Sequence, residues 1–310
     1  GDSPIVNALI EAAEAGKQVL AVIEIRARFD EQANVRWARK LEDVGVHVVY
    51  GLVGFKTHAK LSLVVREEGN AVRRYSHVGT GNYNPKTARM YEDLGLLSAD
   101  DQLGEDLNKL FNQLSGFAPQ YSYERLLVAP RTIRSGLLER INREIENKKA
   151  GKHAFIRLKL NSLLDEEFVE ALYAASIAGV EIDLVVRGIC SLLPGIPGVS
   201  ENIRVRSVLG RFLEHSRIFH FANGGDDEIY IGSADLMDRN LNRRVESLVR
   251  ITRAEHKKSL MKVFDLYVAS TTSGWHLLPT GKWLRVTQNP DASPMNDLQA
   301  VVIDSYRVNQ

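Results

Sequence analysis

The stretch GFKTHAK, residues 54–60, and its counterpart RFLEHSR, residues 211–217, decide the architecture of this chain. Each places a phenylalanine three residues before a histidine and a cation two residues after it. An apolar run, a polar turn and a return run follow in both copies, and the returns end at VGTGN (78–82) and IGSAD (231–235). The two copies are separated by about half of the 310-residue chain, so the pattern predicts a duplicated domain.

Composition argues against several classes of protein. Forty lysines and arginines stand against 39 aspartates and glutamates, and the net charge of +1 gives no global indication of a nucleic-acid coat or a polybasic membrane anchor. No apolar run approaches the ~20 residues of a membrane span, and no signal peptide is visible. The single cysteine, Cys190, excludes an internal disulfide and has apolar flanks that predict a buried structural thiol. We expect a cytoplasmic protein.

Helical and strand patterns alternate in both halves, which indicates α/β layering. In the second half, a strand over residues 155–160 precedes a helix over residues 165–178 and a strand over residues 180–186. The first half has the same order but opens directly on the helix after Ser3-Pro4. We therefore expect the corresponding first-half strand upstream of Gly1, in a longer parent protein.

The repeat predicts two tandem α/β domains with similar sheets. We place the N-terminally truncated first domain at residues 1–125 and the second at residues 126–310, with the active site in the cleft between them. The segment from Ser273 onward is rich in turn residues. We expect it to form an irregular C-terminal tail.

The spacing around each histidine predicts a phosphoryl-transfer site. Side chains on a strand alternate between its faces, so a cation two residues after a histidine shares its face. His58 therefore points into the same space as Lys60. His215 is matched with Arg217 in the same way. A nucleophile with cations for the phosphate oxygens is the equipment of phosphoryl transfer.

The ends of the two return strands add short polar groups to this prediction. Their side chains are Thr80, Asn82, Ser233 and Asp235. We expect turns at Gly79 and Gly232, whose backbone N–H groups would add anion contacts.

Two carboxylates at equal offsets are candidates for orienting the histidines, because a nucleophilic histidine needs its other ring nitrogen held. Asp93 lies eleven residues after Asn82, and Glu246 lies eleven residues after Asp235. A lone histidine beside a lysine is most often a surface pair, but the same pattern twice favours a functional site. The histidines without a counterpart, expected to be structural or surface residues, are His47, His77, His153 and His256.

Three arginines follow predicted strands: Arg26, Arg28 and Arg187. Such residues are often simply solvated. Because α/β sheets bind ligands at the carboxyl ends of their strands, we expect two of the three to contact phosphate.

The paired HxK and HxR motifs, each followed by G-[ST]-x-[ND], resemble the phospholipase D superfamily, in which two such halves form one site. The phosphodiesterases of that superfamily have an aspartate where this chain has Val65 and Ala222. Longer strings resemble polyphosphate kinase of the ATP-using, phosphohistidine type. These strings are ARFDE (27–31), FKTHAK (55–60), HVGTGNYN (77–84), TARMY (87–91), VRGIC (186–190) and RFLEHSR (211–217).

This resemblance implies reversible transfer of the terminal phosphate of ATP to polyphosphate through a phosphohistidine. It implies that His58 is phosphorylated, and that His215 contacts the nucleotide phosphates and acts as acid or base. Tyr91 and Arg187 match nucleotide-contacting residues. Arg28 matches an arginine assigned to the magnesium site, where a guanidinium contacts the ion only through phosphate oxygens.

The family enzyme is longer at its N-terminus, and its further domains carry part of the nucleotide site and the dimer contacts. The resemblance therefore implies a homo-oligomer for the full-length protein, with Mg²⁺, ATP or ADP, and polyphosphate as partners, and no nucleic acid. Two alternatives stay open. One is a phospholipase D-like phosphodiesterase, and the other is a fragment that binds polyphosphate without turnover.

Overall fold

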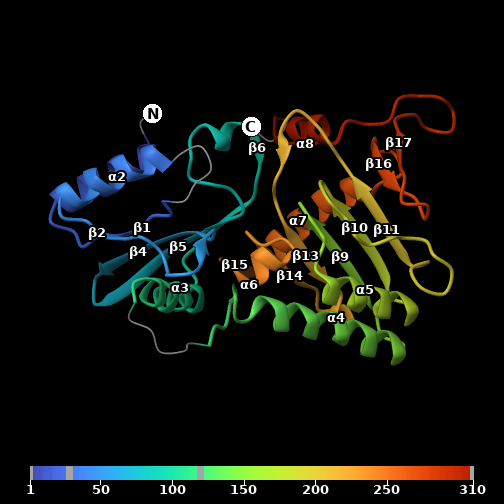
Figure 1. The fold of residues 1–310 in the computed structure, drawn as a ribbon, viewed down its shortest axis with the longest axis horizontal. Coiled ribbons are helices and arrows are strands. Elements are labelled where there is room, and N and C mark those ends of the chain that lie inside the picture. Colours follow the sequence, from blue (N-terminus) through green and yellow to red (C-terminus); the bar gives the residue numbers. More distant parts are fainter. Residues whose placement is uncertain (1–2, 26–30, 117–121, 308–310) are drawn as a thin grey trace.

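The computed structural model describes residues 3–25, 31–116 and 122–307, which form two α/β halves side by side (Figure 1). The elements of the first half are α1 (Pro4–Glu14), β1 (Leu20–Val22), α2 (Glu31–Asp43), β2 (His47–Val49), β3 (Lys56–Thr57), β4 (Lys60–Glu68), β5 (Ala71–Gly79), β6 (Tyr91–Glu92), β7 (Gly95–Ser98) and α3 (Asp101–Leu114).

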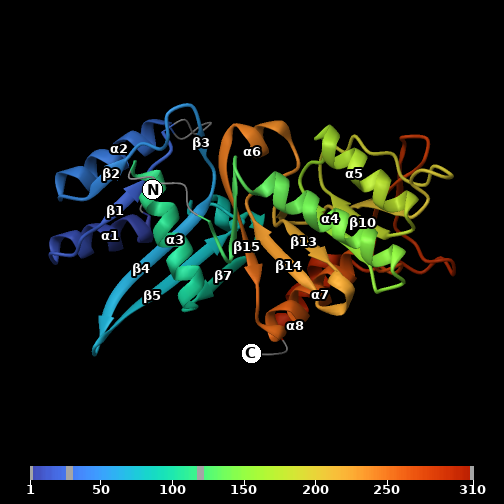
Figure 2. The same cartoon turned by 90° about the horizontal axis from the view of Figure 1, so that it is seen from below.

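The first half contains two separate small sheets. Strands β1 and β2 pair in parallel, and apolar residues of α1 and α2 pack on them. Strands β4, β5 and β7 form an antiparallel sheet, whose long hairpin is clear in Figure 2. Helix α1 begins where Ser3 accepts a hydrogen bond from the Val6 backbone N–H and proline occupies the first turn, as the sequence predicts.

The second half is built on one large sheet. Its elements are β8 (Leu126–Ala129), α4 (Ile133–Lys149), β9 (Phe155–Leu160), α5 (Glu166–Ile177), β10 (Glu181–Val186), β11 (Ile203–Ser207), β12 (Leu213–Glu214), β13 (Ile218–Phe221), β14 (Glu228–Gly232), α6 (Asp238–Asn242), β15 (Arg244–Ile251), α7 (Ala254–Val268), β16 (Gly274–Leu277), β17 (Trp283–Val286) and α8 (Leu298–Arg307). The sheet order is β17-β16-β11-β10-β9-β13-β14-β15-β3, with β8 also paired to β15.

Apolar residues cover both faces of this sheet. On β10, Ile182 and Leu184 belong to the core shared with α4 and α5, whereas Val185 belongs to the core shared with α7 and α3. This alternation has the period of two expected for a strand. The second half therefore has helices on both faces of its sheet, and the second core continues into the first half.

The expectation of two similar sheets is wrong for the described residues. In the second half, β9 lies between β10 and β13 and joins them into one sheet. Among the described residues of the first half, no strand joins the β1–β2 pair to the β4–β5–β7 sheet. An upstream strand that would close this gap stays a prediction.

The expectation of an irregular tail is also wrong. Strand β16 pairs antiparallel with β11, and β17 extends the same edge. Helix α8 follows, and the buried side chain of Gln299 on this helix bonds the backbone of Phe212. The sequence pattern of this segment is dominated by turn residues. Its short strands form because β16 pairs with β11, at the edge of a sheet that is distant in sequence.

Two short strands cross between the halves. Strand β3 of the first half pairs in parallel with the start of β15, where Lys56 is opposite Arg244. Strand β12 of the second half pairs in parallel with β6, where Leu213 is opposite Tyr91. Each half thus contributes the residues just before its histidine to a strand of the other half.

None of the helices in the described part of the chain is both long and apolar enough to cross a membrane.

Candidate active site between the two halves

The His58 imidazole is held by a carboxylate of the opposite half. Its Nδ1 lies 2.8 Å from Oε2 of Glu246, a residue of β15 that is fully buried. Burial raises the pKa of Glu246, but His58, Lys60 and a hydrogen bond from Ser233 outweigh this effect and lower it, so the group is ionised. An ionised carboxylate only accepts, so Nδ1 carries the proton and Nε2 carries the free lone pair.

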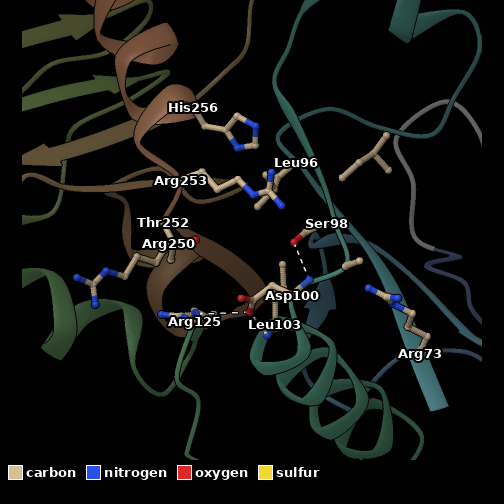
Figure 3. A pocket seen from close by; sticks show the side chains of 12 residues that line it. Arg73, Leu96, Ser98, Asp100, Leu103, Arg125, Arg250, Thr252, Arg253 and His256 are labelled. Carbon is tan, nitrogen blue, oxygen red and sulfur yellow. Dashed lines mark hydrogen bonds and ion pairs between the residues drawn. The ribbon is translucent and has the colours of Figure 1, made fainter. Parts of the chain in front are cut away.

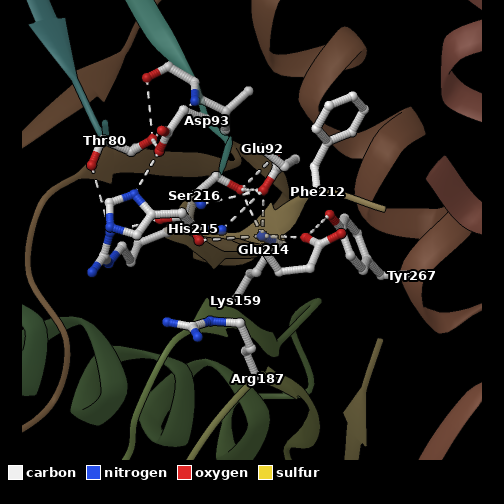
Figure 4. A network of polar contacts seen from close by, with 12 residues as sticks. Thr80, Glu92, Asp93, Lys159, Arg187, Phe212, Glu214, His215, Ser216 and Tyr267 are labelled. Atoms are coloured by element: carbon white, nitrogen blue, oxygen red, sulfur yellow. Dashed lines mark hydrogen bonds and ion pairs between the residues drawn. The ribbon is translucent and has the colours of Figure 1, made fainter. Parts of the chain in front are cut away.

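The His215 imidazole has the reciprocal arrangement. Its Nδ1 lies 2.7 Å from Oδ1 of Asp93, in the segment just after β6 of the first half (Figure 4). The ring of Tyr91 packs on it with centroids 4.7 Å apart. Both carboxylates singled out by their offsets therefore contact histidines, and each contacts the histidine of the other half.

The crossed pairing follows from the two strand exchanges. The backbone N–H of His58 donates to the Val245 carbonyl at 2.9 Å, which brings the ring beside the next residue of β15. The backbone N–H of His215 donates to the Glu92 carbonyl at 3.1 Å, which brings it beside Asp93. Neither half orients its own histidine.

The hydroxyl groups of the G-[ST]-x-[ND] motifs bond these carboxylates. Thr80 Oγ1 donates to Asp93 Oδ1 at 2.9 Å, and Ser233 Oγ donates to Glu246 Oε2. Gly81 is required here, because an added Cβ would lie 2.0 Å from Asp93 Oδ2. The motif thus positions the histidines through the carboxylates.

The expected turns at Gly79 and Gly232 are wrong. Both glycines end strands, and Gly232 is opposite Leu248 in the β14–β15 ladder. A Cβ on Gly232 would lie 2.0 Å from the Ser247 carbonyl oxygen, so close strand packing explains the glycine.

The two cations fold back on their own histidines. Lys60 Nζ donates to the His58 carbonyl, and Arg217 Nη1 donates to the His215 carbonyl at 2.6 Å. Arg217 is also paired with Asp235, with 3.1 Å between Nη2 and Oδ2. At the position equivalent to Asp235, the first half has the exposed Asn82.

The electrostatics join the two histidines into one site. The pKa of His58 is lowered to about 4, mainly by burial and further by the charges of Lys60 and Arg217, which together outweigh the raising effect of Glu246. Burial is also the main cause that lowers the pKa of His215, and Arg217 and Lys60 contribute. Each cation thus acts on both rings, which agrees with their expected convergence on one basic site. Both imidazoles are neutral at pH 7.

Burial likewise lowers the pKa of Lys60 to about 7. Arg217 and Arg244 add to this shift, whereas Glu246 and Asp93 oppose it. Lys60 is therefore a cation that titrates near neutral pH.

The other predicted site residues have different surroundings. Arg187 follows β10, and its Nε donates to Asn161 Oδ1 at 3.1 Å. In Figure 4 its side chain lies below Lys159. Asp235 also accepts from the backbone N–H of Asn161 at 2.8 Å. Arg28 and Arg26 lie outside the described residues. The Cys190 thiol is half-buried with its pKa raised by burial, consistent with a structural role.

A buried charge cluster beside His215 was not predicted from the sequence (Figure 4). Lys159 Nζ lies 2.9 Å from Glu92 Oε2 and 3.0 Å from Glu214 Oε2, and donates to Ser216 Oγ at 2.6 Å. Tyr267 OH donates to Glu214. These contacts anchor both residues that flank His215. The only sequence signal is that Glu92 and Glu214 directly precede predicted site residues.

The described ranges contain no cluster of protein side chains that would enclose the predicted magnesium ion. No three histidine, cysteine, aspartate or glutamate side chains there are grouped to hold a metal. The carboxylates of the site already accept hydrogen bonds from imidazole, hydroxyl or guanidinium groups. These carboxylates, already engaged in hydrogen bonds, do not fit a magnesium ion held by the protein alone. Mg²⁺ is often held mainly by substrate phosphates.

Comparison with known proteins identifies the family. Residues 1–120 match Polyphosphate kinase C-terminal domain 1, and residues 126–297 match Polyphosphate kinase C-terminal domain 2. Polyphosphate kinase from Streptomyces coelicolor is 60% identical over 307 residues, covering 99% of this chain and 41% of the relative. That from Synechocystis sp. is 56% identical over 294 residues, covering 95% and 40%. The chain thus spans about two fifths of the length of these relatives.

Solved structures agree with this match. The crystal structure of a polyphosphate kinase from Porphyromonas gingivalis has a TM-score of 0.90 and 36% identity, covering 100% of this chain and 47% of that one. A phosphatidylserine synthase from Haemophilus influenzae, at 8% identity, has a TM-score of 0.58 over 98% of this chain and 84% of its own, and shares the fold alone. The chain therefore belongs to the polyphosphate kinase family, of which it carries both C-terminal domains.

Proposed function

We propose that this chain carries the phosphoryl-transfer site of an ATP-using polyphosphate kinase, with His58 as the residue that is phosphorylated. The observation that carries the proposal is the pair of crossed histidine–carboxylate contacts, His58 with Glu246 and His215 with Asp93. Family membership supports the substrate class, since the relatives are named polyphosphate kinases.

In the first step, the Nε2 lone pair of His58 attacks the terminal phosphorus of ATP. A nitrogen–phosphorus bond forms, the bond from phosphorus to the bridging oxygen breaks, and ADP leaves with that electron pair. The ring keeps its Nδ1 proton and becomes positively charged, and Glu246 stabilises this charge. In the second step, a terminal oxygen of polyphosphate attacks the same phosphorus and forms an oxygen–phosphorus bond. The nitrogen–phosphorus bond breaks, its electron pair returns to Nε2, and His58 becomes neutral again.

The surrounding cations stabilise the charge that develops on the phosphate oxygens. Lys60 lies two residues after the nucleophile in sequence and is not neutralised by a motif carboxylate. Arg217 shares its charge with Asp235, so we expect it to hold geometry as well as to attract anions. Arg187 would contribute a bidentate phosphate contact from the second half.

His215 is proposed to contact the nucleotide phosphates and to act as acid or base. Its neutral ring, with Nδ1 on Asp93, leaves Nε2 free to accept a proton or a hydrogen bond. Tyr91 packs on this ring and is the proposed nucleotide-contacting aromatic. Mg²⁺ belongs to the proposal as an ion that accompanies the ATP phosphates and offsets their charge, and the steps above depend on the protein side chains.

A phosphodiesterase of the phospholipase D type is the second candidate, favoured only by the shared fold. Of the two positions where such enzymes have aspartate, Val65 is exposed on β4 and Ala222 is fully buried in the core. Val65 is opposite Arg74 in the β4–β5 hairpin, and the Ala222 backbone N–H donates to the Phe155 carbonyl. The third candidate, a polyphosphate-binding fragment without turnover, shares every contact described here and differs only in the outcome of a labelling experiment.

The test is incubation of the full-length protein with ATP labelled at its terminal phosphate. We expect acid-labile, base-stable label that is absent from H58A and retained in H153A, since His153 is an exposed histidine away from the site. Undiminished label in H58A would contradict the proposal. Phosphodiester cleavage without label would support the second candidate, and polyphosphate binding without label would support the third.

A further inference from the structure

A basic cavity lies on the seam between the halves (Figure 3), and neither histidine–carboxylate pair is among its lining residues. Its volume of about 380 Å³ is far above the roughly 15 Å³ that holds one water molecule. The first half contributes Arg73 of β5 and the segment from Leu96 to Asp100, and the second half contributes Arg253 and His256 at the start of α7. The cavity therefore exists only where both halves meet.

The lining of the cavity is strongly cationic, with four arginines against one aspartate. Arg125 is paired with that aspartate, with 3.5 Å between Arg125 Nε and Asp100 Oδ1. Arg250 is paired with Glu228, with 3.6 Å between Arg250 Nε and Glu228 Oε1. Arg73 has no ion-pair partner within the described ranges. Arg253 has only an exposed contact with its neighbour Glu255, and such contacts contribute little. The charges of Arg73 and Arg253 are thus available to a ligand.

The start of α7 adds a second feature that favours anions. Arg253 is the N-cap residue of this 15-residue helix, and its side chain makes no capping hydrogen bond. The N–H groups and dipole of a helix N-terminus attract phosphate. His256 lies in the first turn and lines the same cavity. Figure 3 shows the guanidinium groups of Arg73 and Arg253 on either side of Ser98.

The cavity is distinct from the candidate active site. Strand β15 reaches both, with Glu246 near its start and Thr252, which lines the cavity, just past its end. Six residues of strand span about 20 Å. Between them, Leu248 and Val249 are fully buried in the apolar cores.

We propose that this cavity is a second anion site, which binds phosphate oxyanions between Arg73 and Arg253. Multiple arginines from different elements, with a helix N-terminus, match the geometry of phosphate better than that of a single carboxylate. Two sources supply such a ligand: inorganic phosphate, and a polyphosphate chain, the latter resting on the proposed function. A bound chain would be held by both halves at a distance from the growing end.

The experiment is an NMR titration of the chain carrying ¹³C-labelled histidine, at constant ionic strength. His256 reports on the cavity, while His58 and His215 report on the candidate active site in the same spectrum. We expect phosphate or polyphosphate to shift the His256 resonance. The ligand concentration that gives half of this shift should differ from the one that applies to the His58 and His215 resonances. The double substitution R73Q/R253Q should raise the half-saturating concentration at least tenfold. K258Q/K262Q, which removes two exposed charges from the same helix, should change it less than twofold.

The two sources are separated by comparing equal concentrations of phosphate groups. Tighter binding of polyphosphate identifies the chain as the ligand, and equal binding identifies the single oxyanion. A His256 resonance that does not move, or moves equally in R73Q/R253Q and the parent, overturns the inference. Labelling of His58 is measured separately, so failure of the proposed anion site and failure of the proposed function are distinguishable.

Discussion

Replacement of Glu246 by glutamine tests the crossed pairing most directly. The buried carboxylate accepts hydrogen bonds from His58, Ser233 and Asn240. Glutamine keeps the size but supplies only one acceptor oxygen and an NH₂ group. The buried Asn240 Oδ1 has no hydrogen-bond partner in the described part of the chain. Rotation of the Asn240 amide lets this oxygen accept from the new NH₂ group, so we expect E246Q to fold.

The catalytic loss follows from the charge. Phosphorylation makes the His58 ring positive, and Glu246 is the carboxylate that contacts it, at 2.8 Å. Unit charges about 4 Å apart interact by roughly 4 kcal/mol at an effective dielectric constant of about 20. Removal of the carboxylate charge should therefore slow formation of the phosphohistidine about a thousandfold, since ~1.4 kcal/mol corresponds to a factor of ten.

The assay is single-turnover labelling of the full-length protein by ATP, with folding checked by circular dichroism and thermal unfolding. E144Q is the matched control, because Glu144 is also fully buried but bonds the Asn223 backbone away from both histidines. We expect E144Q to label within about threefold of the parent rate. A folded E246Q that labels within tenfold of the parent would refute the role given to this carboxylate.

Three further substitutions probe the same site. The pKa of Lys60 is lowered to about 7, so its charge is lost as pH rises through neutrality. The kcat/KM for ATP should therefore fall about tenfold per pH unit above pH 8, and K60R should remove this decline. Parallel pH profiles of K60R and the parent would count against this role of Lys60. G81A places a Cβ 2.0 Å from Asp93 Oδ2, so turnover should drop at least tenfold, and unchanged turnover would show that Asp93 moves freely. K159M leaves the buried Glu214 and the half-buried Glu92 without their cation. It should lower the free energy of unfolding by about 3 kcal/mol in urea, and a change under about 1 kcal/mol would contradict this.

Much of the site was predicted from the sequence because it depends on local repeats. The histidines, the cations and the carboxylates at equal offsets are all read from spacing within each half. Equal offsets identify equivalent residues, but they do not say which histidine a carboxylate reaches. That choice is made by β3 and β12, two-residue strands whose partners are distant in sequence. The crossed pairing therefore had no signal in the sequence.

The buried cluster around Lys159 was missed for a different reason. Lys159 lies on β9, where charged and apolar residues alternate as they do on a strand with one solvated face. The face is covered instead by β6 of the first half and by α7, whose Tyr267 ring lies 4.9 Å from Lys159 Nζ. Packing of α7 from the same half and of β6 from the first half turns a surface pattern into a buried one.

The reciprocal contacts resemble those of a symmetric dimer, in which residue i meets residue j and j meets i. With such symmetry the two histidines would be equivalent, so the difference between them must come from residues that break the repeat. Asp235 neutralises Arg217, whereas Asn82 at the equivalent position leaves the charge of Lys60 free. A free cation beside His58 attracts the phosphate that is transferred. We therefore expect N82D to weaken ATP labelling of His58 and to leave the His215–Asp93 contact in place.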